Sequence, residues 1–130
     1  MPITTGYKEL IAKAREKIIT LTQEEAAAKL EDPSVIFVDI RDFRELKREG
    51  KIPNAFHAPR GMLEFWVDPE SPYFKPIFGE EKEFILYCQS AWRSSLAAAT
   101  LKDMGFQNIA HIEGGFKAWK EGGLPTENVE

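Results

Sequence analysis

The sequence predicts an α/β fold in which helices cover both faces of a parallel sheet, making three layers, with an extra helix at the N-terminus. Two observations carry this prediction. Apolar runs alternate with amphipathic segments along the chain, and residues 35–38 and 84–87 are continuous β-branched and aromatic runs, typical of strands buried on both faces. Strands that alternate with helices form parallel sheets, because parallel neighbours need a crossover between them.

Length and composition indicate one domain and exclude several classes of protein. The 130 residues are too few for two cores, and 43% hydrophobic residues suffice for one core without disulfides. A disordered chain, a collagen-like repeat and a disulfide miniprotein are thereby excluded. We expect no nucleic-acid partner, because the net charge is −4. We also expect no membrane span and no secretory signal, which favours a cytoplasmic protein.

The first half of the chain is expected to supply three helices and three strands. Residues 7–18 carry an amphipathic helical stripe, and residues 18–21 fit a short first strand. The second strand covers residues 35–38, and a short third one covers residues 55–58. Capping boxes predict the starts of two further helices. One begins after Thr22, paired with Glu25, and ends by Asp32-Pro33. The other begins after Asp42, paired with Glu45, carries Phe43 and Leu46 as its apolar stripe, and ends at Gly50.

Residues 59–79 have little periodicity and predict a long loop. Such a loop is uncommon in a small domain and often functional. Its aromatic residues allow two interpretations, a lid or acceptor surface over the site and a satellite core beneath the loop. These residues are Phe65, Trp66, Tyr73 and Phe74.

The second half repeats the order of strand and helix. The run at 84–87 leads directly to Cys88, and residues 108–112 form the last strand. A helix between them carries Leu96, Ala97, Leu101 and Met104 and is capped by Gly105, and a final helix after Gly114-Gly115 carries Phe116 and Trp119.

Cys88 is the candidate nucleophile. It is the single cysteine, which excludes an internal disulfide and a cysteine-rich metal site. It joins a strand to a helix N-terminus, where unpaired N–H groups and the helix dipole favour negative charge, and Arg93 adds a nearby cation. We therefore expect a substantial thiolate fraction, the alternative being a small buried hydrophobic residue. Asp39 follows another strand and is expected at the same edge.

Three motifs resemble those of the rhodanese family of sulfurtransferases. Residues 38–41 (VDIR) with 50–55 (GKIPNA) are similar to the first family signature, and residues 87–94 to the active-site loop. Residues 105–119 resemble the closing signature. The resemblance implies a rhodanese-like fold over residues 18–125, with a helical extension at 1–17 and a C-terminal tail at 126–130.

The resemblance implies a sulfurtransferase in which Cys88 takes sulfane sulfur from an anionic donor such as thiosulfate and carries it as a persulfide. An external thiol, cyanide or protein thiol would accept the sulfur, because the chain has no second cysteine. No metal or organic cofactor is implied. The loop amides would surround the added sulfur and Arg93 would help to hold the donor. The predicted site residues are Cys88 as nucleophile, Gln89, Ser90, Ala91, Trp92, Arg93 and Ser94 in the loop, and Asp39 and Arg41 as its support.

Several alternatives stay open. A non-catalytic binding module or a redox sensor could use the same fold. Tyrosine phosphatases have five residues between Cys and Arg, whereas four separate Cys88 from Arg93, so a phosphatase or arsenate reductase is less favoured. Asp39 and Arg41 either support the loop or form a capping and salt-bridge pair. Trp92 either lines the pocket mouth or packs on the surface.

Three residues depart from the family pattern, and the two histidines have no evident role in it. Ala91 stands where many members have Gly, which is a strained choice if φ is positive there. Lys51 and Asn54 replace the usual His and Gly of the first signature. His57 and His111 have no ligand spacing with Cys88, and we expect them to be hydrogen-bonded strand residues.

Overall fold

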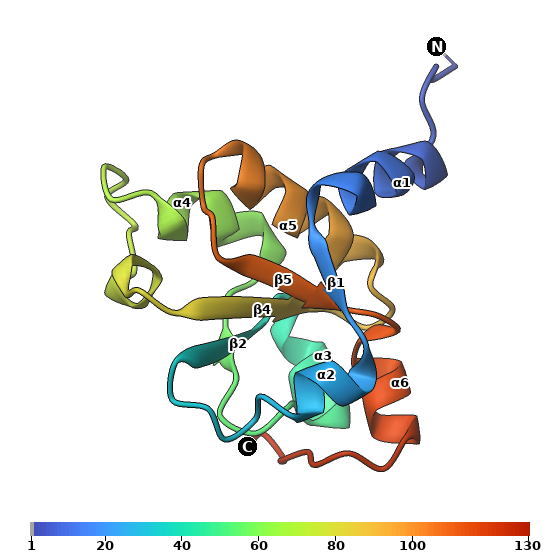
Figure 1. The fold of residues 1–130 in the computed structure, drawn as a ribbon, viewed down its shortest axis with the longest axis vertical. Coiled ribbons are helices and arrows are strands. Elements are labelled where there is room, and N and C mark those ends of the chain that lie inside the picture. The colour runs from blue at the N-terminus through green and yellow to red at the C-terminus, as the bar shows by residue number, and fades with distance from the viewer. Residues whose placement is uncertain (1) are drawn as a thin grey trace.

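The computed structural model describes residues 2–130 and contains a five-stranded sheet between two layers of helices (Figure 1). The strand order is β1-β5-β4-β2-β3, and all neighbouring strands are parallel. The predicted α/β class and parallel sheet are therefore confirmed. The strands are β1 (Ile19–Leu21), β2 (Val35–Asp39), β3 (Phe56–His57), β4 (Glu83–Tyr87) and β5 (Ile109–Ile112).

The helices divide between the two faces of the sheet (Figure 1). One face is covered by α4 (Leu63–Val67) and α5 (Trp92–Asp103), and α1 (Tyr7–Lys17) packs on α5 on this side. The other is covered by α2 (Gln23–Ala27), α3 (Phe43–Glu49) and α6 (Gly115–Glu121).

Strand β4 is buried on both sides, which explains its continuous apolar run. Phe84 and Leu86 belong to the core on the α5 side together with Cys88, whereas Ile85 and Tyr87 belong to the core on the α6 side. This alternation follows from the two-residue period of a strand. The cysteine therefore continues the row of side chains that faces α5.

Both predicted capping boxes are present, although the helix after Thr22 is shorter than predicted. The Glu25 amide donates to Thr22 Oγ1 at 3.1 Å, and the Thr22 amide donates to Glu25 Oε1 at 2.8 Å. Helix α2 ends at Ala27, and turns replace its expected continuation to residue 32.

Two residues assigned to buried helix faces are exposed. Phe43 is 48% exposed because it occupies the first position of α3, where its ring lies 5.8 Å from the ring of His57 at the short edge strand β3. Met104 is 46% exposed because α5 ends at Asp103, so this side chain follows the last helical residue.

The long loop predicted for residues 59–79 contains three short helical segments, so that prediction is wrong in part. They are η1 (Arg60–Met62), α4 and η2 (Pro76–Gly79), each too short to show periodicity in the sequence. Trp66 and Phe74 pack against the core on the α5 side, while Phe65 and Tyr73 are exposed. Trp66 and Phe74 therefore extend the core, as in the satellite-core interpretation, whereas Phe65 and Tyr73 do not.

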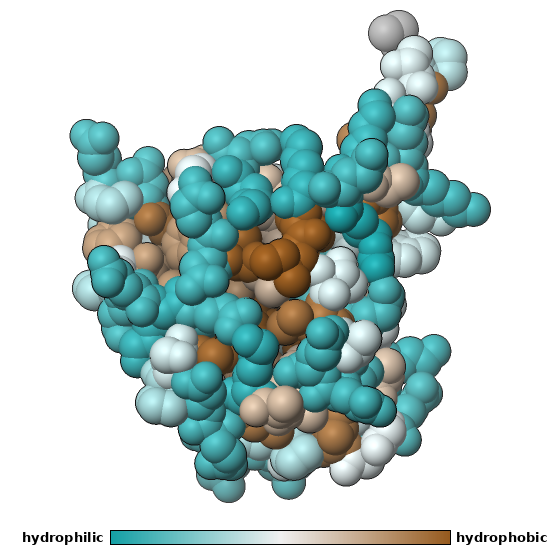
Figure 2. Space-filling view, viewed as in Figure 1, coloured by the Kyte–Doolittle hydropathy of each residue, from teal (hydrophilic) through white to brown (hydrophobic). Residues whose placement is uncertain are grey.

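The N-terminal helix packs on α5 at one corner of the molecule. Arg15 pairs with Glu113, and Lys17 Nζ lies 3.2 Å from Asp103 Oδ1. Figure 2 shows this helix as a protrusion from a surface on which hydrophilic residues predominate. Among the helices of residues 2–130, none combines the length and the apolar character that a membrane span requires.

Candidate active site

The single cysteine lies at the carboxyl end of the central strand. Cys88 directly follows β4, and the neighbouring strand β2 ends at Asp39, so both residues reach the same edge of the sheet. The Cys88 side chain is 1% exposed, and its Sγ accepts a hydrogen bond from the Ser94 amide at 3.3 Å. The Ser94 amide is therefore a backbone donor directed at the sulfur.

Helix α5 begins four residues after the cysteine, and its first turn provides hydrogen-bond donors. The first four N–H groups of a helix have no partner within it. Here the Ser94 amide donates to the cysteine sulfur and the Ser95 amide donates to a loop carbonyl. Within the described part of the chain, the amides of Trp92 and Arg93 donate to no acceptor. Free amides and the helix dipole make this end suitable for an anionic sulfur species.

Ala91 has a strained backbone conformation. Its φ is 71° and its ψ is 0°, in the left-handed region that favours glycine. The residue is also buried, and it immediately precedes α5. The chain therefore carries the strain that the departure from Gly implied.

We expect the substitution Ala91→Gly to raise the free energy of unfolding by about 0.5 kcal/mol, because relief of about 1–2 kcal/mol of left-handed strain exceeds the loss of one buried methyl group, about 0.8 kcal/mol. Urea denaturation of both proteins measures this change. An unchanged or lower midpoint for Ala91→Gly would contradict the prediction.

Helix α6 holds the loop from the opposite side. The Phe116 amide donates to the Cys88 carbonyl at 2.8 Å, and the Lys117 amide donates to the Gln89 carbonyl at 3.0 Å. Gly115 allows this approach: its φ is 63°, and a Cβ there would lie 2.6 Å from both carbonyl oxygens. Gly115 thus determines how closely α6 can approach the loop.

A buried ion pair supports the loop from β2. Asp39 and Arg41 are both 0% exposed, with Arg41 Nη2 at 2.7 Å from Asp39 Oδ2. The guanidinium also donates to the Gly50 carbonyl at 2.7 Å and to Gln89 Oε1 at 3.2 Å. It lies 4.2 Å from the ring centre of Phe116. The two residues therefore form a salt bridge, and Arg41 also contacts the loop through Gln89. The pair thus combines the two interpretations, a salt bridge and a support of the loop.

Arg93 forms a bidentate ion pair that the sequence did not indicate. Its Nη1 and Nη2 lie 2.8 and 3.0 Å from the two carboxylate oxygens of Glu45, whose Oε2 also accepts the Asp42 amide at 3.0 Å. The hydrogen bond from Arg93 is the main cause that lowers the pKa of Glu45, and the same bond raises the pKa of Arg93. The positive charge expected from Arg93 is thus balanced by Glu45.

Trp92 packs against the N-terminal helix. It is 55% exposed, and its ring centre lies 5.0 Å from that of Tyr7 in α1. This contact places α1, which comes before the first strand in the sequence, directly beside the start of α5. Trp92 therefore packs on the surface, next to the residues that form the loop.

Both histidines are hydrogen-bonded strand residues, as predicted. His57 Nε2 lies 2.7 Å from the Arg41 carbonyl. His111 is 0% exposed; its Nδ1 lies 2.9 Å from Ser94 Oγ and its Nε2 lies 2.9 Å from Thr20 Oγ1. Burial, with a smaller effect of the nearby Arg15 charge, lowers the pKa of His111 to about 4.

We expect His111 to make the protein less stable in acid. Its pKa falls from 6.5 in the unfolded chain to about 4 in the fold, so the unfolded state binds the additional proton between these values. Stability is therefore lost as the pH falls from 6.5 to 4, by about 3 kcal/mol for this group. Urea denaturation at several pH values tests this. His111→Asn should show a smaller loss over that window, and equal losses would contradict the assignment.

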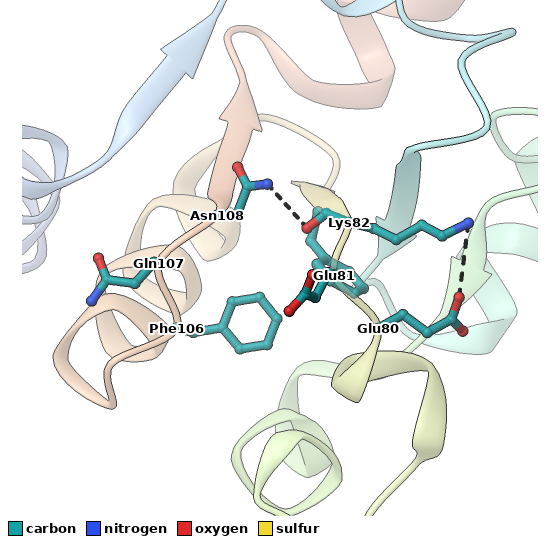
Figure 3. Close-up of a pocket in the computed structure, with 7 residues that line it drawn as sticks. Glu80, Glu81, Lys82, Phe106, Gln107 and Asn108 are labelled. Atoms are coloured by element: carbon teal, nitrogen blue, oxygen red, sulfur yellow. Dashed lines mark hydrogen bonds and ion pairs between the residues drawn. The ribbon is translucent and has the colours of Figure 1, made fainter.

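Figure 3 shows a pocket at the other end of the strands, lined by residues 80–82, Phe84 and residues 106–108. It lies where β4 and β5 begin, whereas Cys88 lies where β4 ends. Some of its polar groups interact: Asn108 Nδ2 donates to the Lys82 carbonyl at 3.2 Å, and Lys82 Nζ donates to the Pro33 carbonyl at 2.8 Å and lies 3.8 Å from Glu80 Oε1. None of the predicted site residues lines this pocket.

Comparison with protein families and curated proteins relates the chain to known domains. Residues 22–122 match the family model of the rhodanese-like domain. An uncharacterised protein of Synechocystis sp. is 33% identical over 89% of this chain and 60% of its own length. The tRNA uridine(34) hydroxylase of Cronobacter sakazakii is 32% identical over 84% of the chain, which spans only 32% of that protein.

Two solved structures are similar over nearly the whole chain. A Rhodopseudomonas palustris protein, described as of unknown function and a possible tyrosine phosphatase, is 52% identical with a TM-score of 0.95 and 98% coverage of both chains. The polysulfide-sulfur transferase homodimer of Wolinella succinogenes is 31% identical with a TM-score of 0.71, covering 95% of this chain and 88% of that one.

Proposed function

Because this chain belongs to the family of rhodanese-like domains, we propose that it is a sulfurtransferase that carries sulfane sulfur on Cys88. One observation carries the proposal: Cys88 Sγ accepts the Ser94 amide at the start of α5, on a loop held by α6 and by Arg41. The similar polysulfide-sulfur transferase supports this reaction class.

The reaction is a two-step exchange of one sulfur atom. The Cys88 thiolate attacks the sulfane sulfur of thiosulfate, a new S–S bond forms, and the bond to the sulfonate sulfur breaks, so that sulfite leaves with the electron pair. A thiolate or cyanide then attacks the outer sulfur of the persulfide, and Cys88 leaves as the thiolate. A polysulfide can replace thiosulfate as the donor by the same steps. Neither step requires a metal or an organic cofactor.

The residues around Cys88 have distinct roles in this proposal. The Ser94 amide stabilises the thiolate that attacks and later leaves, and the free amides of Trp92 and Arg93 provide further donors for an anionic sulfur species. Arg93 is held by Glu45, so an anionic donor meets an ion pair rather than an unbalanced cation. We therefore assign the binding of the donor mainly to backbone N–H groups.

A phosphatase is the second candidate, because one similar structure is described as a possible tyrosine phosphatase. The geometry favours it less. Four residues separate Cys88 from Arg93, and the guanidinium already pairs with Glu45 through two hydrogen bonds. A loop of this length suits one sulfur atom better than a whole phosphate group. The hydroxylase relatives are about three times as long as this chain, and only the shared domain enters the comparison.

Intact-protein mass spectrometry tests the proposed function. We expect reduced protein incubated with thiosulfate or polysulfide to gain the mass of one sulfur atom, which cyanide then removes as thiocyanate. Cys88→Ser should gain nothing, because its hydroxyl forms no persulfide. If the folded protein gains no sulfur from either donor but hydrolyses p-nitrophenyl phosphate, the phosphatase is correct. If it does neither, the domain is a binding or redox-sensing module.

A further inference from the structure

A chain of hydrogen bonds connects the cysteine sulfur to the edge strand of the sheet. The Ser94 amide donates to Cys88 Sγ at 3.3 Å, and Ser94 Oγ lies 2.9 Å from His111 Nδ1 on β5. On the far side of the ring, His111 Nε2 lies 2.9 Å from Thr20 Oγ1 on β1. The side chain and the backbone of one serine thus link the imidazole to the sulfur.

The serine that follows Ser94 shows what a helical hydroxyl does without such a partner. Ser95 Oγ donates to the Ala91 carbonyl at 2.6 Å, within its own turn, which is the usual contact of a serine in a helix. The Ser94 hydroxyl instead contacts a different element. Ser94 and His111 are both 0% exposed, so bulk water does not compete for this contact, which fixes the orientation of the serine side chain.

We propose that His111 is a positioning residue for Cys88, which holds Ser94 so that its amide stays directed at the sulfur. This inference rests on the proposed function, since the amide matters most when the sulfur is a thiolate. Each time the persulfide gives up its outer sulfur, Cys88 becomes an anion in a buried place, and a fixed donor stabilises it without rearrangement. His111 does not touch the reacting atoms and acts through Ser94.

The surroundings of His111 keep the imidazole neutral. The ring is buried, and the charged groups that face it are Arg15 of α1 and Glu113, which pair with each other. A neutral imidazole has one donor and one acceptor nitrogen, which matches its two hydroxyl partners, Ser94 and Thr20. The arrangement therefore stays the same across the neutral pH range.

Two amide substitutions separate the two contacts of the ring. In His111→Asn the amide replaces Nδ1 and can still bond Ser94, whereas in His111→Gln it replaces Nε2 and can bond only Thr20. We expect iodoacetamide to alkylate Cys88 about tenfold more slowly in His111→Gln than in the wild type, with a pH profile shifted to higher pH. In His111→Asn the rate should stay within about threefold of the wild type.

The direction of the change excludes a purely structural role for His111. Cys88 is buried, so a variant that merely loosened the fold would expose the sulfur and increase the alkylation rate. A faster reaction of His111→Gln, or equal rates in the Gln and Asn variants, would overturn the proposal. Unfolding in urea, measured on both variants, confirms that each is folded under the assay conditions.

Ser94→Ala provides a second test that leaves β5 unchanged. It removes the hydroxyl and keeps the amide, so it should slow alkylation as much as His111→Gln does, and the double variant should be no slower than either single one. Independent, multiplying effects would overturn the proposal. Alkylation needs no sulfur donor, so if the wild type reacts as expected but takes up no sulfur, the proposed function fails while the role of His111 remains.

Discussion

Replacement of Arg41 by Met is expected to lower the free energy of unfolding by about 3–5 kcal/mol, because it leaves the Asp39 carboxylate buried without its partner. Both side chains are 0% exposed, and the Gly50 carbonyl and Gln89 lose a donor at the same time. Urea denaturation measures the loss. Sulfur uptake should also slow, since Gln89 belongs to the cysteine loop.

The chain contains a matched control for this pair. Arg44 and Asp42 have the same spacing as Arg41 and Asp39, with nearly the same distance between their charged groups, but the Arg44 side chain is 85% exposed. Arg44→Met should therefore have a far smaller effect on stability, because water screens an exposed pair. If both substitutions cost the same, burial does not determine the strength of these ion pairs.

The sheet could be predicted from the sequence because buried parallel strands have a local signature. The apolar runs at 35–38 and 84–87 lie within β2 and β4. Once these strands are parallel neighbours, Asp39 and Cys88 must lie at one edge. The capping boxes were equally local, since each needs two residues three positions apart.

The contacts that hold the loop could not be predicted in this way. Glu45 and Arg93 are 48 positions apart, and so are Arg41 and Gln89, so no periodicity relates the members of either pair. The capping box alone accounts for a glutamate at position 45, so the sequence gives no reason to expect Arg93 as its second partner. The Gly114-Gly115 pair was a visible signal, but it identifies a turn and not the loop that approaches it.

The loop therefore depends on elements that are remote from it in the sequence. An amide of α5 donates a hydrogen bond to its sulfur, and two amides of α6 donate to its carbonyl groups. Arg41, which lies after β2, donates to its Gln89 side chain. Only the first of these is a consequence of the local strand-loop-helix sequence. Substitutions far from Cys88 in the chain should thus alter its reactivity, and Gly115 is the position where this effect should be greatest.

Gly115→Ala is expected to destabilise the protein by about 3 kcal/mol or more and to reduce kcat/KM for sulfur transfer about 100-fold. The new Cβ would lie 2.6 Å from the carbonyl oxygens of Cys88 and Gln89, and backbone atoms cannot rotate away as a side chain can. The loop must shift, and with it the sulfur and the amide directed at it.

Gly123 is the matched control, because its φ of 74° is close to the 63° of Gly115 but a Cβ there meets no atom within 4 Å. Gly123→Ala should cost about 1 kcal/mol from backbone strain alone and leave kcat/KM unchanged. Equal effects of the two substitutions on stability and on kcat/KM would mean that strain, and not the close approach of α6 to the loop, makes Gly115 necessary.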